Sequence, residues 1–168
     1  NKMLGSLQDA GNTVTLAGYI NLLNESGLLC GLQKFSIDNA RRKASIPKLQ
    51  VYNNALKMVY NSLSFEQSLL DRKHWGRIFE SGIGAYLVSQ AFTHRFEVYY
   101  WRERNDEVDF ILRKNNSLIA IEVKSNAEKN TSGLDKFRQN FNPDKAFIVG
   151  EGGITPEEFL SMNIKKLF

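Results

Sequence analysis

Two strand-like runs lie in the middle of the chain. The first covers residues 107–113, where Val108, Phe110 and Leu112 alternate with more polar positions and predict one apolar face. Asp109 falls on the other, less apolar face. The pattern therefore predicts a half-buried strand with a carboxylate on its polar side.

The second run covers residues 118–124 and also alternates, so Glu122 and Lys124 project together from one face of a strand. Residues 114–117 between the two runs are Lys, Asn, Asn and Ser, which suit a turn. We therefore predict an antiparallel hairpin that brings Asp109 toward Glu122.

Apolar spacing, turn residues and helix caps predict further elements on both sides of this hairpin. In chain order these are a helix capped by Asn12 or Thr13 and closed by Gly27, a hairpin of residues 28–37 and 48–52 around the basic turn 39–45, a short helix within 61–73, a helix over 74–92, a strand over 96–102, a helix over 131–141, a strand over 145–150, a short helix opened by Thr155 and Pro156, and an edge segment at the end. Three glycines in the long helix, Gly76, Gly82 and Gly84, predict close approach of a neighbouring segment.

The order of these elements predicts the α/β class, with a mixed sheet flanked by helices. From residue 74 the order is helix, three strands, helix, strand, and the last strand should return parallel to the strand of Glu122. We divide the chain into a module at residues 1–60, a linker at 61–74 and an α/β domain at 75–168. The helix and hairpin of the first module resemble the second half of a winged helix, so we expect a partial winged-helix module there.

The composition, 42% hydrophobic and 24% charged, is typical of a soluble globular protein, and no run approaches the roughly 20 apolar residues of a membrane span. The single cysteine, Cys30, excludes a disulfide within the chain, which fits a cytoplasmic location. There is no initiator methionine at Asn1 and no signal-like segment, so we expect a piece of a longer protein.

The charge is uneven along the chain. Residues 1–74 hold 9 Lys and Arg against 5 Asp and Glu, whereas residues 75–168 hold 13 of each. The whole excess of +4 therefore lies in the first part. This asymmetry favours a first module that meets a polyanion and a second whose acids serve a site.

Two carboxylates and an ammonium group in one pocket fit the metal-assisted hydrolysis of a phosphodiester. Hard divalent cations such as Mg²⁺ or Mn²⁺ take carboxylate oxygens together with water and substrate phosphate. Asp109 and Glu122 could hold such a metal, and Lys124 could orient the attacking water or stabilise developing charge. The residues alone leave a second interpretation open: an ordinary exposed sheet face whose acid and lysine pair for less than about 1 kcal/mol.

Three segments carry a resemblance to a known family. They are WGRIFESGIGAYL, which begins at Trp75, YYWRERNDEVDFIL, which begins at Tyr99, and IAIEVKS, which ends at Ser125. These segments resemble the DUF4143 family, found C-terminal to AAA-type ATPase domains in many bacterial and archaeal proteins. More broadly, the chain resembles the PD-(D/E)XK nuclease superfamily.

The resemblance implies a restriction-endonuclease-like fold for residues 75–168. In the superfamily, an acid on the first helix, an aspartate on one strand and Glu-x-Lys on the next form the site. Here these residues are Glu80, Asp109, Glu122 and Lys124, with the three acids as metal ligands; Val108 stands where the motif's name has proline. The resemblance also implies that the chain's own ATPase domain precedes it, which fits the absence of a P-loop motif.

The first module supplies candidates for binding nucleic acid, DNA above all. Arg41, Arg42 and Lys43 in the basic turn, and Lys48 after it, could contact phosphates without reading sequence. A solvated loop tip explains the three turn charges equally well. The family usually has an acid after the following strand, where this chain has Asn53, so no role for that acid is expected.

The sequence leaves three functions of different classes open. The first is a divalent-metal-dependent nuclease-like domain with a nucleic-acid-binding module, together the C-terminal region of a larger AAA-type ATPase. The second is a non-catalytic module that docks nucleic acid or a protein under the control of that ATPase. A third, weaker hypothesis is a structural oligomerisation domain.

Overall fold

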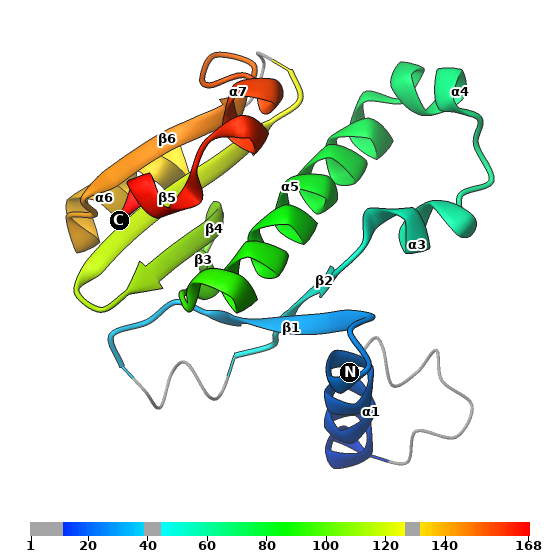
Figure 1. Ribbon diagram of the computed structural model, residues 1–168, viewed down its shortest axis with the longest axis horizontal. Coiled ribbons are helices and arrows are strands. Elements are labelled where there is room, and N and C mark those ends of the chain that lie inside the picture. Colours follow the sequence, from blue (N-terminus) through cyan, green and yellow to red (C-terminus); the bar gives the residue numbers. More distant parts are fainter. Residues whose placement is uncertain (1–11, 39–44, 127–131) are drawn as a thin grey trace.

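The computed structural model describes residues 12–38, 45–126 and 132–168. Its elements in chain order are α1 (Thr13–Glu25), β1 (Leu29–Lys34), β2 (Lys48–Val51), α3 (Asn54–Val59), α4 (Phe65–Leu70), α5 (Arg72–His94), β3 (Glu97–Glu103), β4 (Asp106–Lys114), β5 (Ser117–Lys124), α6 (Ser132–Phe141), β6 (Lys145–Gly150), α7 (Pro156–Ser161) and the 3₁₀ helix η2 (Ile164–Leu167). The strands form one six-stranded sheet in the order β2-β1-β3-β4-β5-β6 (Figure 1). The predicted α/β class, a mixed sheet flanked by helices, is confirmed.

The predicted succession of helix, three strands, helix and strand is also confirmed. Strands β3, β4 and β5 pair antiparallel, and β6 returns parallel to β5 after α6. The hairpin between β4 and β5 closes at the pair Lys114 and Ser117, and Asn115 takes a φ of 54° in its turn. Asparagine tolerates this left-handed region better than most residues, so the turn sequence suits the turn.

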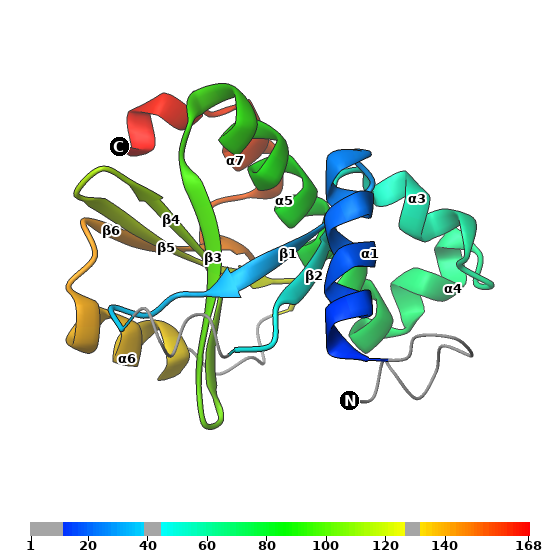
Figure 2. The same cartoon turned by 90° about the horizontal axis from the view of Figure 1, so that it is seen from below.

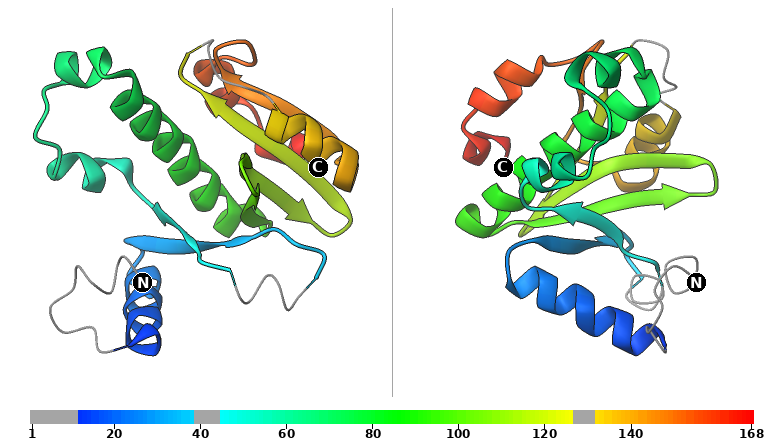
Figure 3. Two further views of the ribbon diagram at one scale, coloured as in Figure 1. Left: turned by 180° about the vertical axis from the view of Figure 1, so that it is seen from behind. Right: turned by 90° about the vertical axis from the view of Figure 1, so that its right-hand side faces the viewer.

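The β1–β2 hairpin extends this sheet on the far side of β3. Strand β1 is antiparallel to β2 and parallel to β3, through the pairs Gln33 with Tyr99 and Lys34 with Tyr100. Helix α1 packs beside β1, at the end of the molecule away from α6 and β6 (Figure 3). Strands from both sides of residues 61–74 therefore belong to one sheet. The division of the chain into two parts at residues 61–74 stays a prediction.

Helices cover both faces of the sheet (Figure 2), and each face carries its own hydrophobic core. On one face, α5, α7 and η2 cover a cluster that includes Leu87, Phe110 and Phe159. On the other face, α6 covers a cluster that includes Trp101 and Phe137. Since both faces of β4 and β5 are covered, a polar side chain on the inner part of these strands is held away from water.

The predicted strict alternation along β4 is wrong. Phe110 lies in the core under α5, but Val108 lies in the core under α6 together with Ile111. The cause is a shift in the pairing with β3, which moves from Tyr99 opposite Ile111 to Trp101 opposite Val108, so β4 uses one residue more than its partner. Such a bulge reverses the facing of the residues beyond it.

Two local expectations also need correction. Residues 54–59 form helix α3, which the pattern did not predict, and Asn53 caps it by accepting a hydrogen bond from the Ala55 backbone N–H. The end of the chain forms η2 rather than an edge segment. Ile164 and Leu167 are three residues apart, so a 3₁₀ turn buries both against the core.

None of the helices within the described residues combines the length and apolar content needed to cross a lipid bilayer.

Candidate functional site

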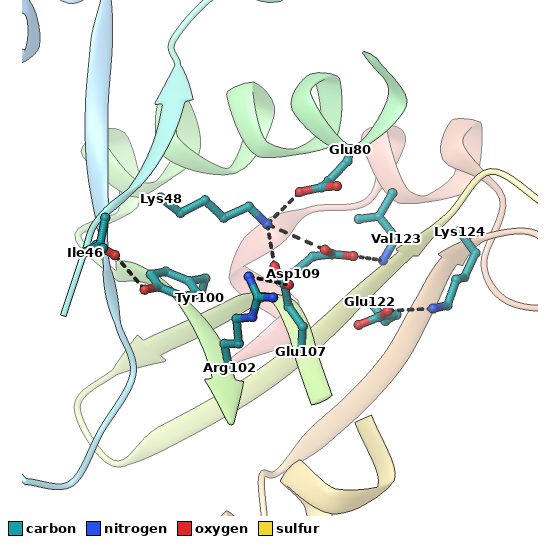
Figure 4. Close-up of polar contacts among 10 residues, drawn as sticks. All are labelled: Ile46, Lys48, Glu80, Tyr100, Arg102, Glu107, Asp109, Glu122, Val123 and Lys124. Atoms are coloured by element: carbon teal, nitrogen blue, oxygen red, sulfur yellow. Dashed lines mark hydrogen bonds and ion pairs between the residues drawn. The ribbon is translucent and has the colours of Figure 1, made fainter. Parts of the chain in front are cut away.

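A cluster of charged side chains lies where α5, β4, β5 and β2 meet (Figure 4). Its members come from four elements: Glu80 from α5, Glu107 and Asp109 from β4, Glu122 and Lys124 from β5, and Lys48 from the first residue of β2. The carboxylate of Asp109 points to Lys48 and to the backbone of Val123, whereas the carboxylate of Glu122 points to Lys124. We call these six residues the charged cluster.

Asp109 owes its position to the irregularity in β4. Backbone pairing between β4 and β5 extends from Lys114 opposite Ser117 up to Phe110 opposite Ile121. Beyond that pair, the Val123 backbone N–H donates to Asp109 Oδ2 at 2.8 Å. A side-chain oxygen thus takes the role of a backbone acceptor just where the ladder ends. This bond fixes the Asp109 carboxylate beside β5.

Lys48 reaches three carboxylates of the cluster. Its Nζ lies 2.6 Å from Glu80 Oε1, 3.6 Å from Asp109 Oδ1 and 3.6 Å from Glu107 Oε1. Burial favours the neutral amine, but attraction by Asp109, Glu80 and Glu107 outweighs it and raises the pKa of Lys48. The side chain is therefore an ammonium cation held among acids.

The segment before Lys48 is anchored on β3. The Tyr100 hydroxyl donates a 2.7 Å hydrogen bond to the Ile46 carbonyl. Further along β2, Gln50 is buried and its Nε2 donates to the Ser81 carbonyl of α5 at 2.9 Å. A methyl group on Gly84 would collide with Gln50 and with the Phe110 ring. The close approach predicted for the α5 glycines thus holds at Gly84, where it seats β2 on the helix.

The environment of Asp109 disfavours its charge. Burial, followed by the negative charges of Glu80 and Glu122, raises the pKa of Asp109 from 3.8 to about 7. Lys48 and the Val123 N–H pull the pKa of Asp109 down, but they offset only part of this effect. A carboxyl group that titrates near neutral pH is common at functional sites.

Glu122 and Lys124 form a second, buried pair within the cluster. Lys124 Nζ donates to Glu122 Oε1 at 2.6 Å, and the two residues are 5% and 9% exposed, respectively. Burial raises the pKa of Glu122, although Lys124 and the backbone N–H of Asp109 oppose the shift. Their common strand face, predicted from the alternation, is therefore buried rather than solvated.

The sequence did not predict that Glu107 and Lys48 belong to the charged cluster. Glu107 lies two residues before Asp109 on the same strand side, a spacing that could have indicated it, and Arg102 approaches it at 3.8 Å. Lys48 was predicted as a phosphate contact, and its ammonium group instead lies against the carboxylates. The other predicted phosphate contacts, Arg41, Arg42 and Lys43, lie outside the described residues.

A pocket of about 480 Å³ opens beside Lys124. Trp75 and Phe79 of α5 form an aromatic wall, and the glycine-rich loop 150–153 after β6 forms another side. Lys124 and Thr155 also line the pocket. The pocket thus gives Lys124 a route to solvent.

The cluster fits a divalent cation by its chemistry. All the donors are carboxylate oxygens, which hard cations prefer, and a cation already lies among them, the Lys48 ammonium. In the side-chain conformations of this structure, however, no three Asp, Glu, His or Cys residues of the described ranges form a group that could hold a metal ion. A metal would therefore require some of these side chains to rearrange.

These features define a mixed α/β domain with a partly buried, acid-rich site at the open end of the β4–β5 hairpin, away from its turn. Residues 75–160 match the model of the family described as domain of unknown function DUF4143. The chain belongs to the DUF4143 family. No curated protein and no solved structure matches the chain.

Proposed function

We propose that this chain is the C-terminal region of a larger AAA-type ATPase and that its α/β domain is a divalent-metal-dependent, nuclease-like domain of the PD-(D/E)XK type. The observation that carries the proposal is that Lys48 links Glu80 of α5 to Asp109 of β4, and that Asp109 is bonded to the Val123 backbone, between Glu122 and Lys124 of β5. The order of α5, β3, β4, β5, α6 and β6, with its antiparallel and parallel pairs, supports the restriction-endonuclease-like fold.

In this proposal Glu80, Asp109 and Glu122 hold Mg²⁺ or Mn²⁺. Such a cation supplies Lewis acidity and lowers the pKa of a bound water. Lys124 lies 2.6 Å from Glu122 and lines the pocket, so it can donate a hydrogen bond to a phosphate oxygen or to the attacking water. Partial burial of the cluster strengthens these electrostatic effects, because fewer water dipoles oppose them.

We further propose that the substrate is nucleic acid, DNA in the first place. Helix α1 and the β1–β2 hairpin would be the partial winged-helix module that holds it, and Arg41, Arg42 and Lys43 between the two strands would contact phosphates. In support, the excess positive charge of the chain lies in residues 1–74.

A second candidate function has one observation in its favour. Lys48 and Lys124 already neutralise much of the acidic cluster, as the side chains of a structural polar network would. On this ground the domain would be a non-catalytic module that docks nucleic acid or a protein under the control of the ATPase domain. It would cleave nothing, and its affinity would barely change when Glu122 loses its charge.

A cleavage assay separates the two candidates. Single- and double-stranded DNA and RNA are incubated with Mg²⁺ or Mn²⁺ and with the chain, both alone and joined to its ATPase domain. We expect Glu122→Gln to abolish cleavage, because the amide keeps the shape but loses the charge that retains the cation. Lys124→Ala should greatly reduce turnover while metal binding persists.

Glu66→Gln on the exposed surface of α4 is the matched control, since it also removes one carboxylate charge but lies outside the cluster and the proposed nucleic-acid-binding module. It should cleave as the unchanged chain does. Cleavage that survives in Glu122→Gln would show that the assigned site is wrong. The absence of metal-dependent cleavage by the joined protein on every substrate would favour the docking module.

A further inference from the structure

Lys48 lies among the acidic side chains of the charged cluster, unlike a typical surface lysine. Its Nζ is 2.6 Å from Glu80 and 3.6 Å from both Asp109 and Glu107, and it lies 5.2 Å from the centre of the Phe110 ring. Only 21% of the side chain is exposed. Three acids and one aromatic face thus surround a single ammonium group.

We propose that Lys48 is a tethered cation that takes the place of a divalent metal beside Glu80 and Asp109, two of the three acids of the proposed metal site, so that a metal can bind there only when Lys48 withdraws. The inference rests on the proposed metal site, and it adds a residue that controls entry to that site. It also gives a reason for the missing metal-ligand arrangement among the described residues, since the carboxylates are turned to the lysine.

Space and charge both make the two cations exclusive. A Mg²⁺ or Mn²⁺ ion needs carboxylate oxygens at about 2.1 Å, and the ammonium group in contact with Glu80 fills the position such an ion would take. Two cations forced into this partly buried space would repel each other strongly, because the effective dielectric constant is low. Metal binding is therefore linked to the departure of the lysine.

The route of withdrawal follows from how β2 is held. Gln50 is 4% exposed and is bonded to α5, so β2 itself stays docked. Lys48 is the first residue of the strand and retains some exposure, so rotation of its long side chain can carry the ammonium group to solvent. The strand need not move.

Calorimetric titration with MnCl₂ tests the inference on the full chain at one fixed pH. Lys48→Met removes the cation and keeps most of the side-chain length, and we expect it to bind Mn²⁺ at least about tenfold more tightly than the unchanged chain, a difference of ~1.4 kcal/mol. Lys136→Met is the control, because Lys136 pairs with Asp106 and Glu103 outside the cluster and should leave the Mn²⁺ affinity unchanged.

Circular dichroism establishes that each variant is folded. If Lys48→Met does not fold, Lys48→Gln decides the question, because it retains hydrogen-bond donors to the carboxylates and loses only the charge. Mn²⁺ affinity of the folded variant that is equal to, or weaker than, that of the unchanged chain would overturn the inference. Tight Mn²⁺ binding without any nucleic-acid cleavage would uphold the inference and count against the proposed nuclease.

Discussion

At the scale of single residues, Asp109 shows how the fold sets the chemistry of one side chain. Its carboxylate is held by the Val123 N–H at 2.8 Å, faces Lys48, and is close enough to Glu80 and Glu122 for their charges to disfavour its own. The raised pKa means that the folded protein binds a proton at a pH where the unfolded chain has released it.

This difference makes stability depend on pH. Between pH values of about 4 and 7, the folded state holds the Asp109 proton and the unfolded state does not, so the free energy of unfolding should fall as the pH rises. We expect Asp109→Asn, which cannot ionise and still accepts from Val123, to be more stable than the unchanged chain at pH 8. The gain has a ceiling of ~4 kcal/mol, at about 1.4 kcal/mol per pKa unit.

Urea unfolding of both proteins at pH 5 and pH 8 measures this effect. The advantage of Asp109→Asn should be larger at pH 8 than at pH 5. A variant that is less stable than the unchanged chain at pH 8 would contradict the account, because it would mean that the charge of Asp109 stabilises the fold.

The sequence could predict the residues of the cluster only in part. The two-residue spacing within β5 placed Glu122 beside Lys124, and the family pattern added Glu80. The contact of Lys48 with Glu80 and Asp109 could not be predicted in this way, because it depends on β1 pairing with β3 far along the chain. No local spacing in the sequence encodes that pairing.

At the scale of elements, α6 packs so closely against β4 at Gly133 that no side chain fits between the two backbones. Gly133 is buried in the first turn of α6, and a methyl group there would run into the main chain of Glu107. Glu107 is a member of the charged cluster, so this contact also supports the site from the opposite face of the sheet.

Two glycine substitutions of the same kind should therefore have opposite effects. Gly133→Ala should lower the free energy of unfolding by about 1–3 kcal/mol, because backbone atoms cannot move aside for the methyl group. Gly18→Ala in α1 should raise it by up to ~1 kcal/mol, because the position is open and alanine is the better helix former. Thermal unfolding of both variants checks this, and a stabilised Gly133→Ala would contradict the packing described here.

Elements with strong local signals were predicted from the sequence, and the rest follow from tertiary contacts. Asn12 caps α1, and Thr155 with Pro156 opens α7, as the capping residues indicated. The bulge in β4 between Val108 and Ile111 was missed because it arises from pairing with β3, which a single strand's alternation cannot reveal. The 3₁₀ turn of η2 was missed because the core, not local propensity, selects it.

At the scale of the whole molecule, the hairpin of the first module and the α/β domain share one sheet. Lys48 is committed to the charged cluster, so sequence-independent binding of nucleic acid would fall to the basic turn. The charge asymmetry of the sequence favoured a polyanion partner. The contact between Lys48 of the hairpin and the acids of the site could not be predicted from that asymmetry, because it depends on the tertiary fold.

The salt dependence of nucleic-acid affinity can separate these roles. Replacing Arg41, Arg42 and Lys43 together by alanine should weaken DNA binding and reduce the slope of log affinity against log salt by about 2–3, at about 0.9 per phosphate contact. Lys48→Met should leave the slope unchanged, because its ammonium group faces carboxylates. Unchanged affinity of the triple variant would place the contact elsewhere, and a reduced slope for Lys48→Met would show that Lys48 binds phosphate.

The central claim is that the acids of α5, β4 and β5 form one cation site. Its most direct test is the anomalous diffraction of Mn²⁺ in crystals of the chain grown with saturating MnCl₂. The account predicts a manganese peak at the carboxylates of Glu80, Asp109 and Glu122, with Lys48 Nζ turned away from Glu80. Crystals in which Lys48 remains on Glu80 and no manganese lies at these carboxylates would contradict it.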